Sequence, residues 1–234
     1  MNYIFDVDGT LTPSRRAMNV AFTSWFEHFA THNAVYLVTG SDREKTLEQI
    51  PESIYNLCCR SYQCSGNDVW LGSLHIRTND FNIPDELYQD LIDELENSKF
   101  HTRTGNHIDE RTGLTNFSIV GRNCSLEDRF LYKQWDEHKF ERITIAKKLG
   151  KKWPGINFQI AGETGIDITA KGATKAQILD DFNDDEPIFF FGDNCQPGGN
   201  DYEIAAAVRE RELGHVYEVN DWEHTWKILK ELSE

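Results

Sequence analysis

The chain has 234 residues, of which 39% are hydrophobic, and this length suits one large domain or a core with a modest second domain. Its formal net charge of −15 disfavours binding to nucleic acid or to anionic membranes, because such a field repels phosphate groups. No apolar stretch approaches the roughly 20 residues that cross a bilayer, and the first residues lack the pattern of a secretory signal. The five cysteines are irregularly spaced, so we expect reduced thiols and a cytoplasmic protein.

The first part of the chain alternates buried strands with helices. Residues 3–7 form an apolar run typical of a strand, residues 17–31 have a helical pattern, and residues 34–38 predict a second buried strand. Ser41 is followed by Glu44, which is the spacing of a capping box and predicts a helix from there towards Ile50.

The middle of the chain has a different character. Pro84 predicts the start of an acidic helix that reaches about Ser98. Ser125 with Asp128 predicts a longer helix that reaches about residue 149. Short strands are expected at 114–120, 156–160 and 166–169. Two helices with several strands predict an α+β insert at 81–172.

The alternation returns in the last third of the chain. Helices are expected at 174–182, 200–211 and 221–232, and strands at 188–191 and 215–219. Continuous apolar strands separated by helices indicate a parallel sheet that is covered on both faces. We therefore predict an α/β fold whose core consists of residues 1–80 and 173–234, with residues 81–172 as an inserted domain.

Polar side chains follow three of the predicted strands. Asp6 and Asp8 end the first strand, Thr39 follows the second, and Asp193 follows the strand at 188–191. Because ligands bind at the carboxyl ends of parallel strands, we expect these side chains to converge. Carboxylates from two strand ends suit Mg²⁺, which keeps several waters and binds substrate phosphate. The sequence therefore predicts a magnesium-dependent phosphoryl-transfer site.

The two aspartates of the first strand suit two chemical roles. Asp6 can attack a phosphoryl group and hold it as an acyl phosphate. Asp8 lies near enough to protonate the leaving oxygen and later to deprotonate the acceptor. Gly9 allows a tight turn that directs N–H groups at phosphate. The alternative, a simple turn after a strand, fits a lone Asp-Gly pair but not this whole segment together with Thr39 and Asp193.

The segment at residues 5–12 resembles the first motif of the haloacid dehalogenase superfamily, with Lys175 at its lysine motif and Asp193 and Asp201 at its acidic motif. Blocks at 40–45, 111–118, 121–129 and 190–201 resemble the eukaryotic-type phosphomannomutases. This resemblance implies a Rossmann-like core with a cap domain, a homodimer joined through the caps and a role in GDP-mannose biosynthesis. The implied reaction interconverts mannose 6-phosphate and mannose 1-phosphate, with a hexose 1,6-bisphosphate as activator.

The resemblance also implies a role for each matching residue. Asp6 is expected to be the nucleophile and Asp8 the acid/base, with Thr39 and Lys175 completing the catalytic set. The expected Mg²⁺ ligands are Asp6, Asp8, Asp193 and Asp201. The expected substrate-binding residues are Arg15 near the substrate, Arg111, Arg122 and Arg129 at the distal phosphate, and Asp167 beside Gly165 at the sugar hydroxyls. Guanidinium groups bind phosphate through two parallel hydrogen bonds, so these arginines supply the cations that an acidic chain needs.

Some positions depart from the family pattern. Gly165 stands where the family has a serine, Thr39 where it has a glycine, and the loop at 169–175 keeps only the family's glycine and lysine. These departures concentrate on the sugar pocket and the hinge and spare the phosphate contacts. Three alternatives stay open: a sugar-phosphate phosphatase in which water discharges Asp6, a mutase for another hexose phosphate, and a non-catalytic phosphosugar-binding protein.

Overall fold

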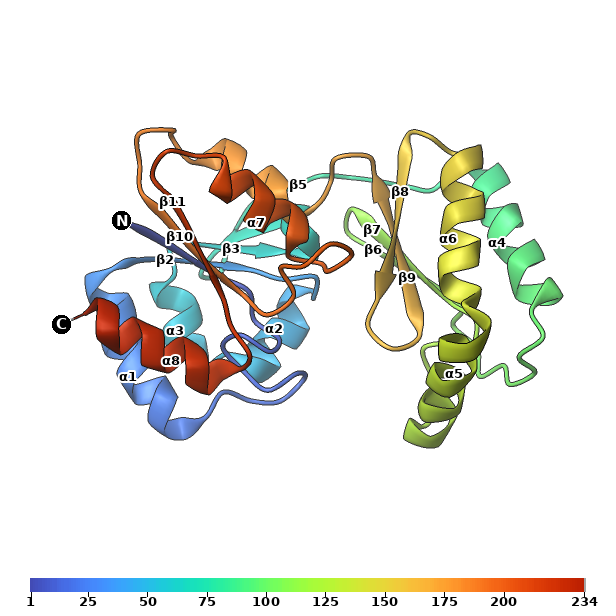
Figure 1. The fold of residues 1–234 in the computed structure, drawn as a ribbon, viewed down its shortest axis with the longest axis horizontal. Helices are drawn as coiled ribbons and strands as arrows, with labels where there is room; N and C mark the ends of the chain where they lie inside the picture. Colours follow the sequence, from blue (N-terminus) through green and yellow to red (C-terminus); the bar gives the residue numbers. More distant parts are fainter. Residues whose placement is uncertain (234) are drawn as a thin grey trace. The chain divides into compact units, whose positions relative to one another are not determined.

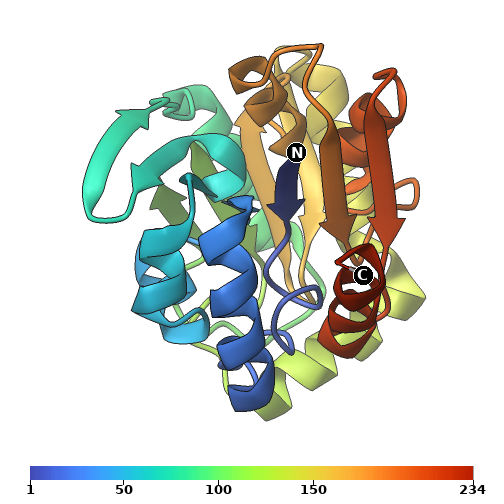
Figure 2. The same cartoon turned by 90° about the vertical axis from the view of Figure 1, so that its left-hand side faces the viewer.

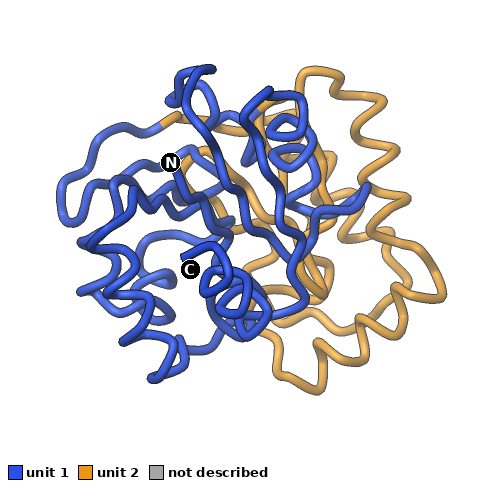
Figure 3. The backbone as a smooth tube through the Cα atoms, turned by 60° about the vertical axis from the view of Figure 1, so that its left-hand side comes forward, with its two compact units in different colours: residues 1–78, 173–234 blue, residues 79–172 orange. Residues whose placement is uncertain are grey.

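The computed structural model describes residues 1–233, and the chain divides into two compact units. Unit 1 comprises residues 1–78 and 173–234, and unit 2 comprises residues 79–172 (Figure 3). Each unit has its own sheet and its own hydrophobic core. Unit 2 is therefore an insertion into the chain of unit 1.

Unit 1 is built on a seven-stranded sheet with the order β11-β10-β1-β2-β3-β4-β5. Its strands are β1 (Asn2–Phe5), β2 (Ala34–Val38), β3 (Arg60–Gln63), β4 (Asp68–Leu71), β5 (Leu74–Thr78), β10 (Ile188–Gly192) and β11 (Gly214–Glu218). The strands from β11 to β3 run parallel, whereas β4 and β5 add an antiparallel extension. Strands β1, β2 and β10 consequently end at the same edge of the sheet.

Helices cover both faces of this sheet (Figures 1 and 2). The helices are α1 (Val20–His32), α2 (Arg43–Gln49), α3 (Glu52–Leu57), the 3-10 helices η1 (Cys64–Gly66) and η2 (Lys175–Asp181), α7 (Tyr202–Arg209) and α8 (Trp222–Leu232). Phe5 and Phe191 stack at 4.9 Å in the core that also contains residues of α1, α3 and α8. Ile4 and Phe190 lie in the core on the other face, with residues of η2 and α7. Both faces of β1 and β10 are buried, which explains their continuous apolar sequences.

Unit 2 consists of a four-stranded antiparallel sheet and three helices. The strands are β6 (Ile108–Arg111), β7 (Leu114–Ser118), β8 (Ile156–Ala161) and β9 (Gly165–Ala170), in the order β6-β7-β9-β8. The helices are α4 (Asp85–Asn97), α5 (Leu126–Lys139) and α6 (Glu141–Lys152). Phe117 and Ile168 of the sheet pack with Leu87, Tyr132 and Leu149 of the helices, so the helices bury one face of the sheet. None of the helices within residues 1–233 has both the length and the apolar character to cross a membrane.

The parallel sheet with helices on both faces confirms the predicted α/β fold. The capping box at Ser125 is also confirmed, since Asp128 N donates to Ser125 Oγ at 3.1 Å and Asp128 Oδ2 accepts from Ser125 N at 3.3 Å. The strands at 2–5, 34–38 and 188–192 lie close to their predicted positions. Elements that the sequence did not predict are α3, the 3-10 helix η1, β6 and the three strands β3, β4 and β5.

The predicted single helix from Ser125 to about residue 149 is wrong. It is two helices, α5 and α6, that meet at Phe140, whose backbone is left-handed with φ 53°. The carboxylate of Asp136 spans the break, where it accepts hydrogen bonds from the Arg142 N–H at 2.8 Å and from Arg142 Nε at 2.7 Å. This pairing satisfies a backbone N–H in the first turn of α6, in a segment without proline or glycine.

Two other predicted helices differ in detail. The helix expected from Ser41 begins at Arg43, and its N-cap is Asp42, whose Oδ1 accepts from Lys45 N at 2.9 Å. The helix expected at 174–182 is the 3-10 helix η2. Asp and Ser are both good N-cap residues, so the sequence pattern does not choose between Ser41 and Asp42.

Candidate active site

The loop that follows β1 is a tight turn built around the Val7 carbonyl. This carbonyl accepts from Leu11 N at 3.0 Å and from Thr12 N at 3.1 Å, and Gly9 N donates to Thr12 O at 2.8 Å. Gly9 has φ +80°, and a Cβ atom at this position would lie 2.3 Å from Asp193 Oδ2. A glycine is required both by this backbone conformation and by the close approach of Asp193.

Three carboxylates and one ammonium group gather at the carboxyl edge of the sheet of unit 1. Asp6, Asp193 and Asp201 each place an oxygen within 4.8 Å of the others. Lys175 Nζ lies 2.5 Å from Asp6 Oδ1 and 2.7 Å from Asp201 Oδ1, and the Lys175 side chain is only 2% exposed. Asp6 and Asp201 are also buried, whereas Asp193 is exposed, so the acidic cluster has a buried side and a side open to solvent.

The acidic cluster has the properties of a site for a hard divalent cation. Its three carboxylates face a single lysine, so fully ionised it carries a net charge of −2. Asp6 Oδ2 is buried without a hydrogen-bond partner, and so is Thr10 Oγ1 of the loop after β1. A buried carboxylate oxygen without a partner is costly unless a cation binds it. Carboxylates on neighbouring strand ends fit Mg²⁺, which binds one or two protein carboxylates together with water and phosphate.

The pKa values of the acidic cluster reflect burial and mutual repulsion. Burial raises the pKa of Asp6, with contributions from Asp201 and Asp193, and the charge of Lys175 offsets only part of this. Asp193 is exposed as a residue, but desolvation of its carboxylate and then the charge of Asp201 raise its pKa to about 6. Burial opposes the charge on Lys175, but Asp201 and Asp6 outweigh it and raise the pKa of this lysine. A bound cation would favour the charged carboxylates and lower their pKa values.

Asp8 lies outside the acidic cluster formed by the described residues. Its Oδ1 accepts from Arg15 N at 2.7 Å and from Gln49 Nε2 at 3.0 Å, and Gln49 also donates to Thr12 Oγ1 at 3.1 Å. The Arg15 side chain is exposed, and its backbone is left-handed with φ 57°. Gln49 at the end of α2 was not predicted as a site residue. No short-range motif indicates it, since it lies 41 residues from Asp8 in the chain.

Thr39 lies directly after β2 at the same edge of the sheet. Its N–H donates to Tyr62 O at 2.9 Å, and its Oγ1 accepts from Ser41 N at 3.1 Å. The residue is 1% exposed. Its hydroxyl therefore shapes the loop that leads to α2.

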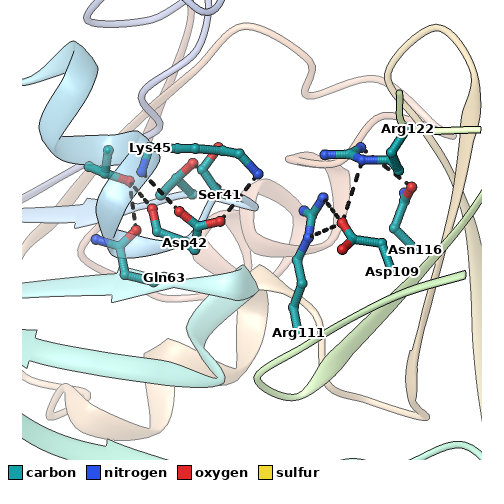
Figure 4. A network of polar contacts seen from close by, with 10 residues as sticks. Ser41, Asp42, Lys45, Gln63, Asp109, Arg111, Asn116 and Arg122 are labelled. Atoms are coloured by element: carbon teal, nitrogen blue, oxygen red, sulfur yellow. Dashed lines mark hydrogen bonds and ion pairs between the residues drawn. The ribbon is translucent and has the colours of Figure 1, made fainter. Parts of the chain in front are cut away.

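In unit 2, Arg111 and Arg122 share one carboxylate (Figure 4). Arg111 Nε and Nη2 donate to Asp109 Oδ2 at 2.9 and 2.7 Å, and Arg122 Nε lies 3.5 Å from the same oxygen. Burial opposes the charge of Asp109, but the hydrogen bonds and charges of the two arginines outweigh it and lower its pKa. Asp109 thus holds the two arginines close together. Two guanidinium groups and one carboxylate leave an excess of positive charge, which suits the binding of a phosphate group.

Asp167 is linked to this arginine pair through Asn116. Asn116 Nδ2 donates to Asp167 Oδ1 at 2.6 Å, and Arg122 Nη1 donates to Asn116 Oδ1 at 3.4 Å. Burial raises the pKa of Asp167, and the hydrogen bond from Asn116 and the charges of Arg111 and Arg122 offset part of this rise. Asn116 was not predicted as a site residue.

The remaining two predicted residues of unit 2 have different surroundings. Arg129 begins the second turn of α5 and pairs with Glu163, Nη1 to Oε2, at 3.9 Å. Glu163 also accepts from Lys133 Nζ at 3.3 Å. Gly165 is the first residue of β9 and is buried.

The predicted site residues thus form two groups, one in each unit. In unit 1, Asp6, Lys175, Asp193 and Asp201 come together beside the loop that carries Asp8. In unit 2, Arg111, Arg122 and Asp167 are joined through Asp109 and Asn116. The first group can hold a cation next to a nucleophilic carboxylate, and the second can bind an anion beside a hydrogen-bond acceptor.

Comparison with known proteins confirms the resemblance to a family. Residues 22–234 match the family model described as eukaryotic phosphomannomutase. The phosphomannomutase of Saccharomyces cerevisiae is 31% identical over 98% of this chain and 92% of its own length. Phosphomannomutase 1 of Mus musculus is 30% identical over 91% of this chain and 85% of its own length.

Solved structures show the same fold at low sequence identity. The C-terminal domain of the trehalose-6-phosphate phosphatase of C. albicans has a TM-score of 0.67, at 13% identity, over 99% of this chain and 91% of that one. A haloacid dehalogenase-like hydrolase from Bacteroides thetaiotaomicron has a TM-score of 0.62, at 13% identity, over 98% of both chains. The fold is therefore that of the haloacid dehalogenase-like hydrolases. With the family match over nearly the whole chain, the protein belongs to the eukaryotic phosphomannomutase family.

Proposed function

We propose that the protein is a phosphomannomutase that interconverts mannose 6-phosphate and mannose 1-phosphate, with Asp6 as the phosphoryl carrier. The observation that carries this proposal is the position of Asp6. One of its oxygens is paired with Lys175 at 2.5 Å, and the other is buried without a partner beside Asp193 and Asp201. Family membership supports the assignment of this carboxylate to phosphoryl transfer.

We also propose Mg²⁺ as the cofactor, held by Asp6, Asp193 and Asp201 with a contribution from the loop at Asp8. The unpartnered Asp6 Oδ2 and the raised pKa values of the acidic cluster support this choice. When bound, the ion neutralises charge on the phosphoryl oxygens and on the attacking carboxylate. Lys175 lies in reach of both Asp6 and Asp201 and holds the attacking carboxylate in one orientation.

The proposed reaction consists of two phosphoryl transfers. In the first, an oxygen of Asp6 attacks the phosphorus of a hexose 1,6-bisphosphate while the bond from phosphorus to the sugar oxygen breaks, and Asp8 donates a proton to that oxygen. In the second, Asp8 removes the proton from a hydroxyl of a hexose monophosphate, and that oxygen takes the phosphoryl group from Asp6. Gln49 and the Arg15 N–H orient Asp8 for both proton transfers.

A mutase has to hold a second phosphate while the first reacts. Arg111 and Arg122 are proposed to bind that distal phosphate, with Arg129 adding a further positive charge. Asp167 is proposed to accept hydrogen bonds from the sugar hydroxyls. Thr39 and Arg15 are proposed to line the substrate path in unit 1. In this assignment unit 1 is the catalytic core and unit 2 is the substrate-binding cap.

We further propose a cytoplasmic homodimer joined through the caps, acting in GDP-mannose biosynthesis. Leu126, Phe130 and Phe140, on α5 and at its end, are 85%, 57% and 62% exposed, and such an apolar surface suits a protein contact. All five cysteines are free thiols, as is usual in a reducing compartment. Light scattering at several concentrations tests the dimer.

The test is an assay of mannose 1-phosphate with Mg²⁺, followed by phosphorus NMR, with and without glucose 1,6-bisphosphate. The proposal predicts mannose 6-phosphate whose formation is stimulated by the bisphosphate and abolished in Asp6→Asn. Glucose 1-phosphate and N-acetylglucosamine 1-phosphate in parallel samples report the sugar preference. Steady release of inorganic phosphate without isomerisation contradicts the proposal.

A second candidate is a sugar-phosphate phosphatase, and Thr39 is the observation that favours it. This hydroxyl side chain stands where the resembling mutases have a glycine, which brings the position closer to the superfamily's phosphatases. In that reaction water takes the phosphoryl group from Asp6. The same NMR assay separates the two reactions, because only hydrolysis accumulates free phosphate.

A further inference from the structure

A row of polar residues crosses the sheet of unit 2. Asp109 of β6 is in register with Asn116 of β7, and Asn116 is in register with Asp167 of β9. Side chains in register on neighbouring strands stand on the same face of a sheet and lie close together. Ile166 and Ile168 point to the opposite face, where they pack against the helices. The row therefore lies on the face that the helices do not cover.

Asn116 is the centre of this row, and the two polar atoms of its side-chain amide have different partners. Its Nδ2 donates to Asp167 Oδ1 at 2.6 Å, while its Oδ1 accepts from Arg122 Nη1 at 3.4 Å (Figure 4 shows the second contact). This orientation of the amide is chemically determined, because the donor faces a carboxylate and the acceptor faces a guanidinium group. Asn116 is 2% exposed, so it acts behind the residues that can reach a ligand.

Gly165 provides the space that this amide occupies. A Cβ atom at position 165 would lie 2.6 Å from Asn116 Nδ2 and 3.2 Å from Asn116 Oδ1. Contacts below about 3 Å are not tolerated by carbon, and the movable atoms here belong to the asparagine side chain. A side chain at position 165 therefore requires the Asn116 amide to move, and we expect this movement to weaken the hydrogen bond from the amide to Asp167.

We propose that Asn116 is a positioning residue that fixes the Asp167 carboxylate relative to the Arg122 guanidinium, and that the absence of a side chain at Gly165 is what allows it. This inference rests on the proposed function, in which Arg122 binds the distal phosphate and Asp167 binds the sugar hydroxyls of the same substrate. The pair Asn116–Gly165 then sets the distance between the phosphate and the sugar ring that this cap accepts.

The test is a double-mutant cycle of Asn116→Ala, Gly165→Ala and the variant with both changes, in the hexose phosphate assay. Each single change is expected to raise the KM for mannose 1-phosphate about tenfold and to change kcat less than about threefold, since one hydrogen bond to a charged group is lost. The inhibition constant of inorganic phosphate is expected to stay within about twofold, because phosphate alone needs the arginines but not Asp167. The double variant is expected to match the single variants, since both changes remove the same contact.

Gly155→Ala is the matched control, because it lies in the same unit and a Cβ there has nothing within 4 Å. Two results overturn the inference while leaving the proposed function intact. The first is a KM of the double variant raised about a hundredfold, because the two changes would then act independently. The second is a KM of Gly165→Ala equal to that of the wild type. If Gly165→Ala does not fold, Asn116→Ala and Asn116→Ser provide the same comparison of KM with the phosphate inhibition constant. A wild-type protein that acts on no hexose phosphate overturns the proposed function and this inference together.

Discussion

The Lys175 ammonium group lies 2.5 Å from Asp6 Oδ1, although the two residues are 169 positions apart in the chain. The same ammonium group lies 2.7 Å from Asp201 Oδ1. Lys175 opens the segment that returns from unit 2, so the fold itself brings the lysine to the end of β1. We therefore expect the Lys175–Asp6 contact to contribute both to the stability of unit 1 and to the reactivity of the proposed nucleophile, Asp6.

Lys175→Met tests this joint role. The change leaves Asp6 and Asp201 buried without their cation, and removal of one partner from a buried pair costs about 3–5 kcal/mol. We expect the free energy of unfolding in urea to fall by about that amount, with loss of activity. Mg²⁺ is expected to restore part of the stability. Lys171→Met, at an exposed lysine of the same loop, is the control, and a Lys175→Met protein as stable as this control would contradict the account.

The raised pKa of Asp193, about 6, gives the stability of the protein a dependence on pH and Mg²⁺. A carboxyl group whose pKa is raised by folding binds protons in the folded state, so its contribution to stability is lost as the pH rises through about 6. A cation replaces those protons. We therefore expect Mg²⁺ to raise the melting temperature more at about pH 7.5 than at about pH 5.

Differential scanning calorimetry with Mg²⁺ and with EDTA measures this difference. Asp193→Asn is expected to reduce the Mg²⁺ effect at the higher pH, whereas Asp184→Asn, at a carboxylate whose side chain is 97% exposed, is expected to keep it. If Mg²⁺ raises the melting temperature equally at both pH values, the ion binds at a site other than Asp193.

Gln49 is expected to act on the rate through Asp8. Gln49→Glu keeps the size of the side chain but places a carboxylate 3.0 Å from Asp8 Oδ1, where an amide now donates. The expected result is a fall in kcat of about tenfold or more with little change in KM, since the loss of a hydrogen bond to a charged group misplaces the acid/base. Glu48→Gln, at the exposed neighbour, is the control. Loss of affinity without loss of kcat would instead make Gln49 a substrate ligand.

Phe140 is a position where a substitution should stabilise the protein. Its φ of 53° is unfavourable for a residue with a side chain, and 62% of the residue is exposed. Phe140→Gly is expected to raise the free energy of unfolding of the monomer, measured at low protein concentration, by about 1 kcal/mol, because glycine adopts this conformation without strain. Phe130→Gly, within α5, is expected to lower it by about 1 kcal/mol. A destabilised Phe140→Gly protein would show that packing of the ring outweighs backbone strain.

The contrast between the predicted and the missed residues has a physical origin. Asp6, Asp8 and Asp193 were predictable because buried apolar strands with acidic ends are recognisable locally, and parallel strands bring such ends to one edge. Strand β3 was missed because most of its residues are polar although it is largely buried, and β4 and β5 were missed because their sequences are mixed and partly or mostly exposed. The break at Phe140 depends on the pairing of Asp136 with Arg142, which no local pattern indicates.

Gln49 and Asn116, which hydrogen-bond to the predicted site residues Asp8 and Asp167, were less predictable than those residues themselves. Gln49 lies at the end of a helix and reaches Asp8 only because α2 packs beside the loop after β1. Asn116 lies in a strand where an asparagine has no evident role until its register with Asp167 is known. The departure at Gly165 was visible in the sequence, but its meaning depends on the position of the Asn116 amide.

The most direct test of the account follows a labelled phosphoryl group. The protein is mixed with Mg²⁺ and glucose 1,6-bisphosphate that carries ³²P. One portion is quenched in acid at once, and a second portion is chased with unlabelled mannose 1-phosphate before it is quenched. We predict label on Asp6, identified by mass spectrometry of the peptide and absent in Asp6→Asn, and its transfer to a mannose bisphosphate in the chase. Label that forms without Asp6, or that passes entirely to inorganic phosphate, would contradict the assignment of the protein as a mutase.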